Sequence, residues 1–190
     1  MAQGNNTRRM VRLALMVSLA TIIWVVEAAL PVPVPVPGAK LGLANAIVLW
    51  CVIAFGFRDA LMVNLLRVVL GALLTGTFMN VSFFLSLAGG TASVLVMGLL
   101  WTTSQRWVSI IGVSLAGAFT HNLAQILTAS VLIGHPAILM YLPFLLFFAL
   151  PTGFFVGLLV SHLGRISLWG EPMVEALRIK TVKGREAVSP

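Results

Sequence analysis

Three ionisable side chains stand inside long apolar stretches of this 190-residue sequence: Glu27, Arg67 and His121. Hydrocarbon makes such groups costly, so each of them is a candidate functional residue. Arg67 would supply a fixed positive charge, and the amides of Asn122 and Gln125 beside His121 would supply directional hydrogen bonds. This set of groups fits the binding of an anion, a carboxylate or a phosphate, better than it fits catalysis.

Two further polar residues, Lys40 and Asn45, flank the start of the next apolar segment. Lys40 adds a second positive charge, so the cations of this group outnumber Glu27. The free amides of a helix that begins after Gly38 would add to the positive potential. We therefore predict a binding site for a small anionic molecule, in which Glu27 orients one of the cations. The predicted substrate-binding residues are Lys40, Asn45, Arg67, His121, Asn122, Gln125 and Glu27.

The elements that must position these side chains are membrane helices. The sequence is 59% hydrophobic and 9% charged, with a mean hydropathy of +1.05, whereas a soluble domain is roughly a quarter charged. About 20 apolar residues cross a bilayer core of roughly 30 Å. The apolar segments predict an all-α membrane protein of six transmembrane helices, at residues 10–30, 41–57, 60–78, 81–101, 108–133 and 137–162.

The basic residues predict that both ends of the chain lie in the cytoplasm. The formal charge is +7, and with this orientation only Lys40 lies outside and only Arg67 within a span, a strong positive-inside pattern. No helix face carries a basic stripe, so nucleic acid is not an expected partner. We predict a cytoplasmic N-terminus at 1–9, a six-helix domain in the cytoplasmic (inner) cell membrane at 10–162, and a basic cytoplasmic tail at 163–190.

Polar and small residues recur at intervals of three and four in the third and fifth segments, which places them on one face of each helix. They are Asn64, Arg67, Gly71 and Thr75 in the third, and Ser114, Gly117, His121, Gln125 and Thr128 in the fifth. At about 1.5 Å per residue, Arg67 lies near mid-membrane and His121 in the outer half. These stripes predict a polar cavity that faces outside. The alternative is that the charged groups neutralise one another and hold the helices together.

Signatures of catalysis are absent from the sequence. It has no GxxxxGK[ST] phosphate loop, and its one aspartate, Asp59, cannot form a DDxxD cluster for magnesium and a diphosphate. The histidines have no neighbouring acids or thiols that would complete a metal site. The single cysteine, Cys51, excludes a disulfide within the chain. We expect neither an enzyme nor a bound metal or cofactor.

A family resemblance is carried by five stretches that run through most of the predicted membrane domain. They are PGAKLGLANAIVL (37–49), FGFRDALMVNLLRVVLGALLTG (55–76), SLAGG (86–90), GVSLAGAFTHNLAQ (112–125) and YLP (141–143). They resemble the Gx transporter family, also known as the heptaprenyl diphosphate synthase component I family. The resemblance implies a fold similar to the S components of energy-coupling factor (ECF) transporters, with six helices and a pocket that opens outward.

S components work with a transmembrane coupling subunit and ATPases, and they often dock through small residues of the first helix. Ala14 and Ser18 are the matching residues here, with serine where those proteins carry alanine. The resemblance thus implies the substrate-binding membrane component of an ECF-type uptake transporter. Its expected partners are a small anionic substrate, the lipid bilayer, the coupling subunit and the ATPases.

Two alternative functions stay open at this point. The synthase name implies a role in prenyl chain elongation, but that reaction needs carboxylate clusters for magnesium diphosphate, and this sequence has none. The chain would then be a non-catalytic membrane accessory subunit of a polyprenyl diphosphate synthase. A third role is that of a membrane partner in flavin or quinone electron transfer.

Overall fold

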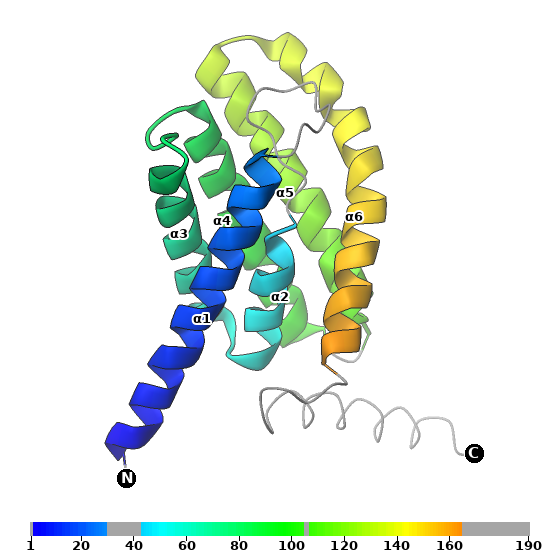
Figure 1. Cartoon of the computed structure of the whole chain (residues 1–190). Helices are drawn as coiled ribbons and strands as arrows, with labels where there is room; N and C mark the ends of the chain where they lie inside the picture. The colour runs from blue at the N-terminus through cyan, green and yellow to red at the C-terminus, as the bar shows by residue number, and fades with distance from the viewer. Residues whose placement is uncertain (1, 30–42, 105–106, 165–190) are drawn as a thin grey trace, which may run out of the picture.

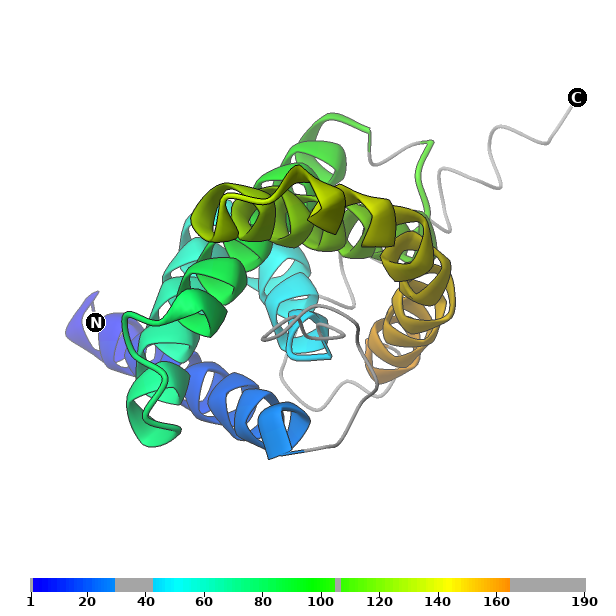
Figure 2. The ribbon, with the colours of Figure 1, turned by 90° about the horizontal axis from the view of Figure 1, so that it is seen from above.

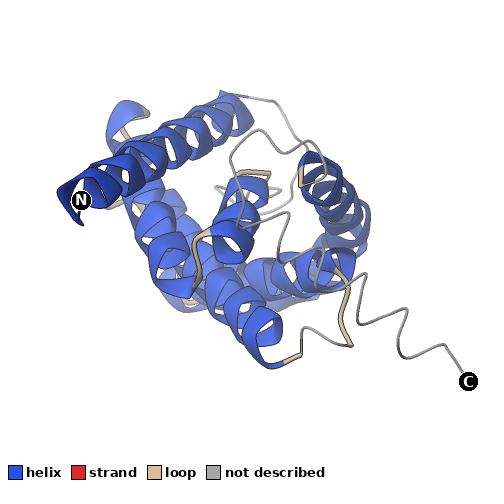
Figure 3. Ribbon diagram, turned by 90° about the horizontal axis from the view of Figure 1, so that it is seen from below, coloured by secondary structure: helices blue, strands red, loops and turns tan. Residues whose placement is uncertain are grey.

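The computed structural model describes residues 2–29, 43–104 and 107–164 (Figure 1). The described residues form six α-helices and one short 3-10 helix, and they contain no strand (Figure 3). The α-helices are α1 (Ala2–Ala29), α2 (Asn45–Ala54), α3 (Phe57–Leu74), α4 (Val81–Thr103), α5 (Ile110–Ile133) and α6 (Leu142–Leu163), and the 3-10 helix is η1 (Pro136–Tyr141). The predicted all-α class with six helices is confirmed.

Four segments are long and apolar enough to cross a membrane: Thr7–Glu27, Val81–Thr103, Ile110–Ile133 and Pro136–Leu163. The chain is therefore a multi-pass membrane protein. The other two helices differ from the prediction. The second predicted span, 41–57, is a helix of 10 residues, which reaches across about half of a bilayer core. The helix α3 has 18 residues but carries three charged side chains, Arg58, Asp59 and Arg67.

The short helix α2 lies at the centre of the bundle. Seen from above, the other five α-helices surround it (Figure 2), and it contacts each of them. It is apolar on all sides, and all of its residues except Ile47 and Ala54 are buried, as expected for a helix with no solvent-facing side. The helix α2 therefore begins inside the bundle, below the upper ends of α1 and α5 (Figure 1).

Local signals fix where the longer helices begin and end. The side chain of Asn80 accepts a hydrogen bond from the Phe83 amide at the start of α4, and Ser109 caps α5 in the same way. Gly134 ends α5 in the left-handed conformation, with φ of 70°, where glycine has no steric penalty. At the other end of the chain α1 extends back to Ala2, so the segment predicted as an N-terminus, 1–9, is helical from residue 2.

Glycines allow two pairs of helices to approach closely. On α3, a Cβ at Gly71 would lie 2.8 Å from Cδ2 of the buried Trp24 on α1. On α6, a Cβ at Gly157 would lie 2.7 Å from Cα of Ile111 on α5. Small residues that let backbones pack together are typical of membrane helices, because packing replaces the hydrophobic effect in lipid. These contacts hold α1 on α3 and α6 on α5.

Candidate functional site

Arg67 is buried in the bundle and binds two neutral amides. Its side chain is 2% exposed, and its Nη2 atom donates to Oδ1 of Asn64 and to Oδ1 of Asn45, each at 2.8 Å. Asn64 stands one turn earlier on α3, and Asn45 is the first residue of α2. The first residue of the central helix α2 thus contacts the guanidinium group of Arg67 on α3.

His121 on α5 continues these contacts. Its Nδ1 atom lies 3.1 Å from Nδ2 of Asn45, and its Nε2 atom lies 2.9 Å from the side-chain nitrogen of Gln125, one turn further along α5. Asn45, Asn64, Arg67, His121 and Gln125 therefore form one hydrogen-bonded chain across α2, α3 and α5. We call these residues the polar network, and every member is buried.

The helix α4 covers the network with two glycines. A Cβ at Gly90 would lie 2.5 Å from Oδ1 of Asn64 and 3.1 Å from Nη2 of Arg67. A Cβ at Gly89 would lie 2.8 Å from Cγ of Gln125. The absence of side chains at this Gly-Gly pair gives the network the room that it occupies.

The network is rich in hydrogen-bond donors and poor in negative charge. Both partners of the Arg67 Nη2 atom are uncharged amide oxygens. The Nε atom of Arg67 and the Nδ2 atom of Asn64 are buried and find no acceptor among the described residues. Each donor left unsatisfied costs about 1–3 kcal/mol, more when it is charged. Glu27 on α1 is also buried, and its carboxylate attracts the guanidinium electrostatically.

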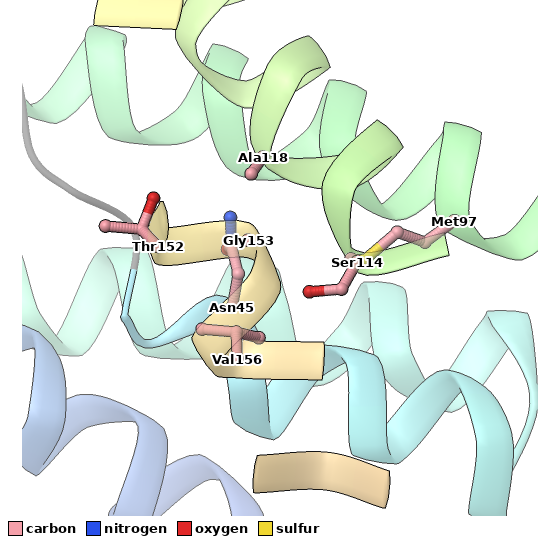
Figure 4. Close-up of a pocket in the computed structure, with 7 residues that line it drawn as sticks. All are labelled: Asn45, Met97, Ser114, Ala118, Thr152, Gly153 and Val156. Carbon is pink, nitrogen blue, oxygen red and sulfur yellow. The ribbon is translucent and has the colours of Figure 1, made fainter. Parts of the chain in front are cut away.

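A small cavity borders Asn45 and lies between α2, α4, α5 and α6 (Figure 4). Its volume is about 10 Å³, which is room for about one water molecule. This is far below the roughly 300 Å³ of a small-molecule pocket, so the cavity itself would not hold a substrate. It is lined by Asn45, Met97, Ser114, Ala118, Thr152, Gly153 and Val156.

The structure brings four of the predicted site residues into the network, namely Asn45, Arg67, His121 and Gln125. Asn122 points elsewhere: its Nδ2 atom donates to the carbonyl oxygen of Leu145 on α6, at 2.9 Å. Consecutive residues of a helix point about 100° apart, so Asn122 cannot share the direction of His121. Lys40 lies outside the described residues.

Sequence reasoning left Asn64, Gly89 and Gly90 out of the predicted site. A sequence feature could have indicated Asn64 as a site residue, because Asn64 lies one turn from Arg67 in the same polar stripe. The feature that indicates the Gly-Gly pair is weaker: adjacent glycines inside a long helix mark a close approach of another helix. Among the described residues, no three His, Cys, Asp or Glu side chains gather in a way that could hold a metal ion.

The residues predicted to dock a partner lie on an exposed face of α1. Ala14 and Ser18 are both exposed, and the Ser18 hydroxyl donates to the Ala14 carbonyl oxygen at 2.9 Å. The same helix is fixed to the start of α3 by Arg9, whose guanidinium forms an ion pair with Asp59. Residues that face away from the bundle on α1 are thus available to lipid or to another protein.

Comparison with known families identifies the chain. The family model described as heptaprenyl diphosphate synthase component I matches residues 16–163, a range that contains the whole polar network. No curated protein and no solved structure matches the chain. The match covers most of the sequence and confirms the family that the five stretches resemble. This membrane protein therefore belongs to the heptaprenyl diphosphate synthase component I family.

Proposed function

We propose that this chain is the substrate-binding membrane component of an ECF-type uptake transporter, and that its polar network binds the anionic group of a small molecule. The observation that carries the proposal is the environment of Arg67, a buried cation whose Nη2 atom binds only neutral amides. Buried charges are costly unless they are paired, and a charged residue within a membrane domain marks a functional site by default.

The unpartnered donors make a carboxylate or a phosphate the fitting ligand group. Arg67 Nε and Asn64 Nδ2 both lack an acceptor within the described part of the chain. An anion supplies acceptor oxygens to such donors and also neutralises the guanidinium, with charge-assisted hydrogen bonds that are about twice as strong as neutral ones. The guanidinium of Arg67 would repel a ligand ammonium group.

The position of α2 supports the same ligand class. This helix begins inside the bundle, and its N-cap residue, Ala44, makes no side-chain capping hydrogen bond. The start of a helix carries a partial positive charge, and transporters use interrupted helices to point such ends at anionic groups near mid-membrane. We propose that α2 and α3 complete a set of six membrane segments, with both chain ends in the cytoplasm.

The exposed face of α1 would hold the coupling subunit. Ala14 and Ser18 are small, and large apolar side chains around them, such as Leu15 and Ile22, are also exposed. A surface of small residues lets a partner helix approach closely. The partners in this proposal are a transmembrane coupling subunit and its ATPases.

Co-purification tests the proposal. The tagged chain, extracted gently from its own membranes, should bring down a transmembrane subunit and ATPases, and ATP should drive uptake of the ligand when these subunits are reconstituted together. Recovery of the ATPases with Ala14→Trp should fall, because tryptophan would fill the docking surface. Recovery of the chain without any ATPase, from membranes that contain the complete transporter, would contradict the proposal.

The description of the family favours a second candidate, a non-catalytic membrane accessory subunit of a polyprenyl diphosphate synthase. A diphosphate is also an anion and would suit the donors of Arg67 and Asn64. The same purification separates the two candidates, because a soluble synthase with aspartate-rich magnesium sites would then be the partner.

A further inference from the structure

The hydrogen bonds of the polar network have a direction that starts at Arg67. A guanidinium group has donors only, so the atom of Asn45 that lies 2.8 Å from Nη2 must be the carbonyl oxygen. The NH2 group of Asn45 then faces His121, with its nitrogen 3.1 Å from Nδ1. The reversed amide would set two donors against each other at the Arg67 side. Arg67 therefore fixes the orientation of Asn45.

The orientation of Asn45 in turn fixes the protonation of His121. An amide nitrogen can only donate, so Nδ1 of His121 must present its lone pair to Asn45. A neutral imidazole carries its one proton on the other nitrogen, Nε2. A doubly protonated ring would present N–H to the NH2 group of Asn45 and break this contact, so the network holds the ring neutral.

The same direction continues to Gln125. With a proton on Nε2, His121 is a donor at that side, where the amide of Gln125 lies 2.9 Å away and can accept through its carbonyl oxygen. The backbone of Gly89 also forms a hydrogen bond with the ring. The oxygen and nitrogen of a glutamine amide differ little in shape, and their assignment follows from the hydrogen-bond network. We assign the carbonyl oxygen of Gln125 to the position that faces Nε2, so that the NH2 group points away from the ring.

We infer that the polar network is a one-way relay, in which Arg67, acting through the positioning residue Asn45, holds His121 as the neutral Nε2–H tautomer that donates to Gln125. The relay itself stands on hydrogen-bond geometry alone. Its role in the function, to keep the guanidinium of Arg67 oriented toward an anion, rests on the proposed function. It also assigns different roles to two buried amides, since Asn45 must donate to the ring and Gln125 must accept from it.

Nuclear magnetic resonance of His121 in bilayers tests this relay. The chain has three histidines, and His135→Gln with His162→Gln leaves His121 as the only signal; both replaced side chains are exposed. The ring nitrogen and carbon shifts distinguish the two neutral tautomers and the doubly protonated ring. The wild-type network should show the Nε2–H tautomer.

Two matched amide-to-acid variants make the test specific. Asn45→Asp leaves only acceptors toward Nδ1, so the proton should move to Nδ1 or the ring should become doubly protonated. Gln125→Glu keeps an acceptor toward Nε2, so the wild-type tautomer should stay. An Nδ1–H tautomer in the wild type, or the same change in both variants, would overturn the relay. If Asn45→Asp does not fold, the tautomer of His121 in the wild type and in Gln125→Glu still tests the relay.

Anion uptake is measured separately, so that the relay and the proposed function can fail independently. If His121 has the expected tautomer but the chain binds no anion, the relay is supported and the proposed function is contradicted. If the chain binds its anion through Arg67 but His121 has the Nδ1–H tautomer, the proposed function is supported and the relay is contradicted. Loss of uptake in Asn45→Asp together with a changed tautomer identifies Asn45 as a positioning residue.

Discussion

Replacement of Asn64 by aspartate should weaken anion binding strongly while it changes the shape of the site little. Asn64 is fully buried, and its Oδ1 atom already lies 2.8 Å from Nη2 of Arg67. Its Nδ2 atom is an unpartnered donor within the described residues. Asn64→Asp replaces that donor with an acceptor and supplies a negative charge to the guanidinium from within the protein.

The expected loss follows from the distance between two negative charges. A ligand anion and the new carboxylate would both contact the guanidinium of Arg67, and we take a separation of about 6 Å between the two negative charges for the Coulomb energy. At an effective dielectric constant of about 20, they repel each other by about 2.8 kcal/mol. This corresponds to a roughly 100-fold increase in Kd. The loss of the donor from Asn64 would add to this value.

The assay is a titration of the purified protein with the ligand that it retains from the membrane. Asn80→Asp is the matched control, because Asn80 is exposed and caps α4, where aspartate caps equally well. It lies about 15 Å along α4 from Gly90 and therefore from the network. Equal Kd values for Asn64→Asp and the control would refute an anion site at Arg67.

Three further predictions concern packing, charge and docking. Gly90→Ala should lower the free energy of unfolding by about 1–3 kcal/mol, because its Cβ would lie 2.5 Å from Asn64 Oδ1; an unchanged denaturation midpoint would contradict the close contact. Arg9→Gln should destabilise the fold more than Asp59→Asn, because it leaves a carboxylate unpaired that is only 9% exposed, whereas the Arg9 side chain is 60% exposed; the opposite order in thermal unfolding would contradict this. Ala14→Trp should leave the unfolding temperature unchanged and lower the recovery of the ATPases in a pull-down. A lower unfolding temperature together with lower recovery would indicate that Ala14 packs within the chain.

The long helices could be predicted from the sequence because their signals are local. The helix α4 spans Val81–Thr103, against a predicted 81–101, and α5 spans Ile110–Ile133, against 108–133. Long, predominantly apolar runs set these lengths, and capping residues set their starts. The short helix α2 could not be predicted in the same way. Hydropathy does not distinguish a helix buried in protein from one that faces lipid, so its length was overestimated.

The composition of the network could be predicted only in part. The high cost of an ionisable group in hydrocarbon and the helical spacing of the polar residues predicted Arg67 and His121 as site residues. The structure places both in one hydrogen-bonded chain. The direction of each side chain decides the rest, and one residue along a helix turns this direction by about 100°. Asn122 therefore binds the backbone of α6, although it is next to His121 in the sequence.

Native mass spectrometry of the gently purified protein tests the central proposal most directly. The wild type should carry a small molecule with a carboxylate or phosphate group, and this mass should persist in Asn80→Asp. It should be lost in Arg67→Gln, which removes the charge that the anion neutralises. A ligand without an acidic group, or an anion retained equally by Arg67→Gln, would contradict the proposed site.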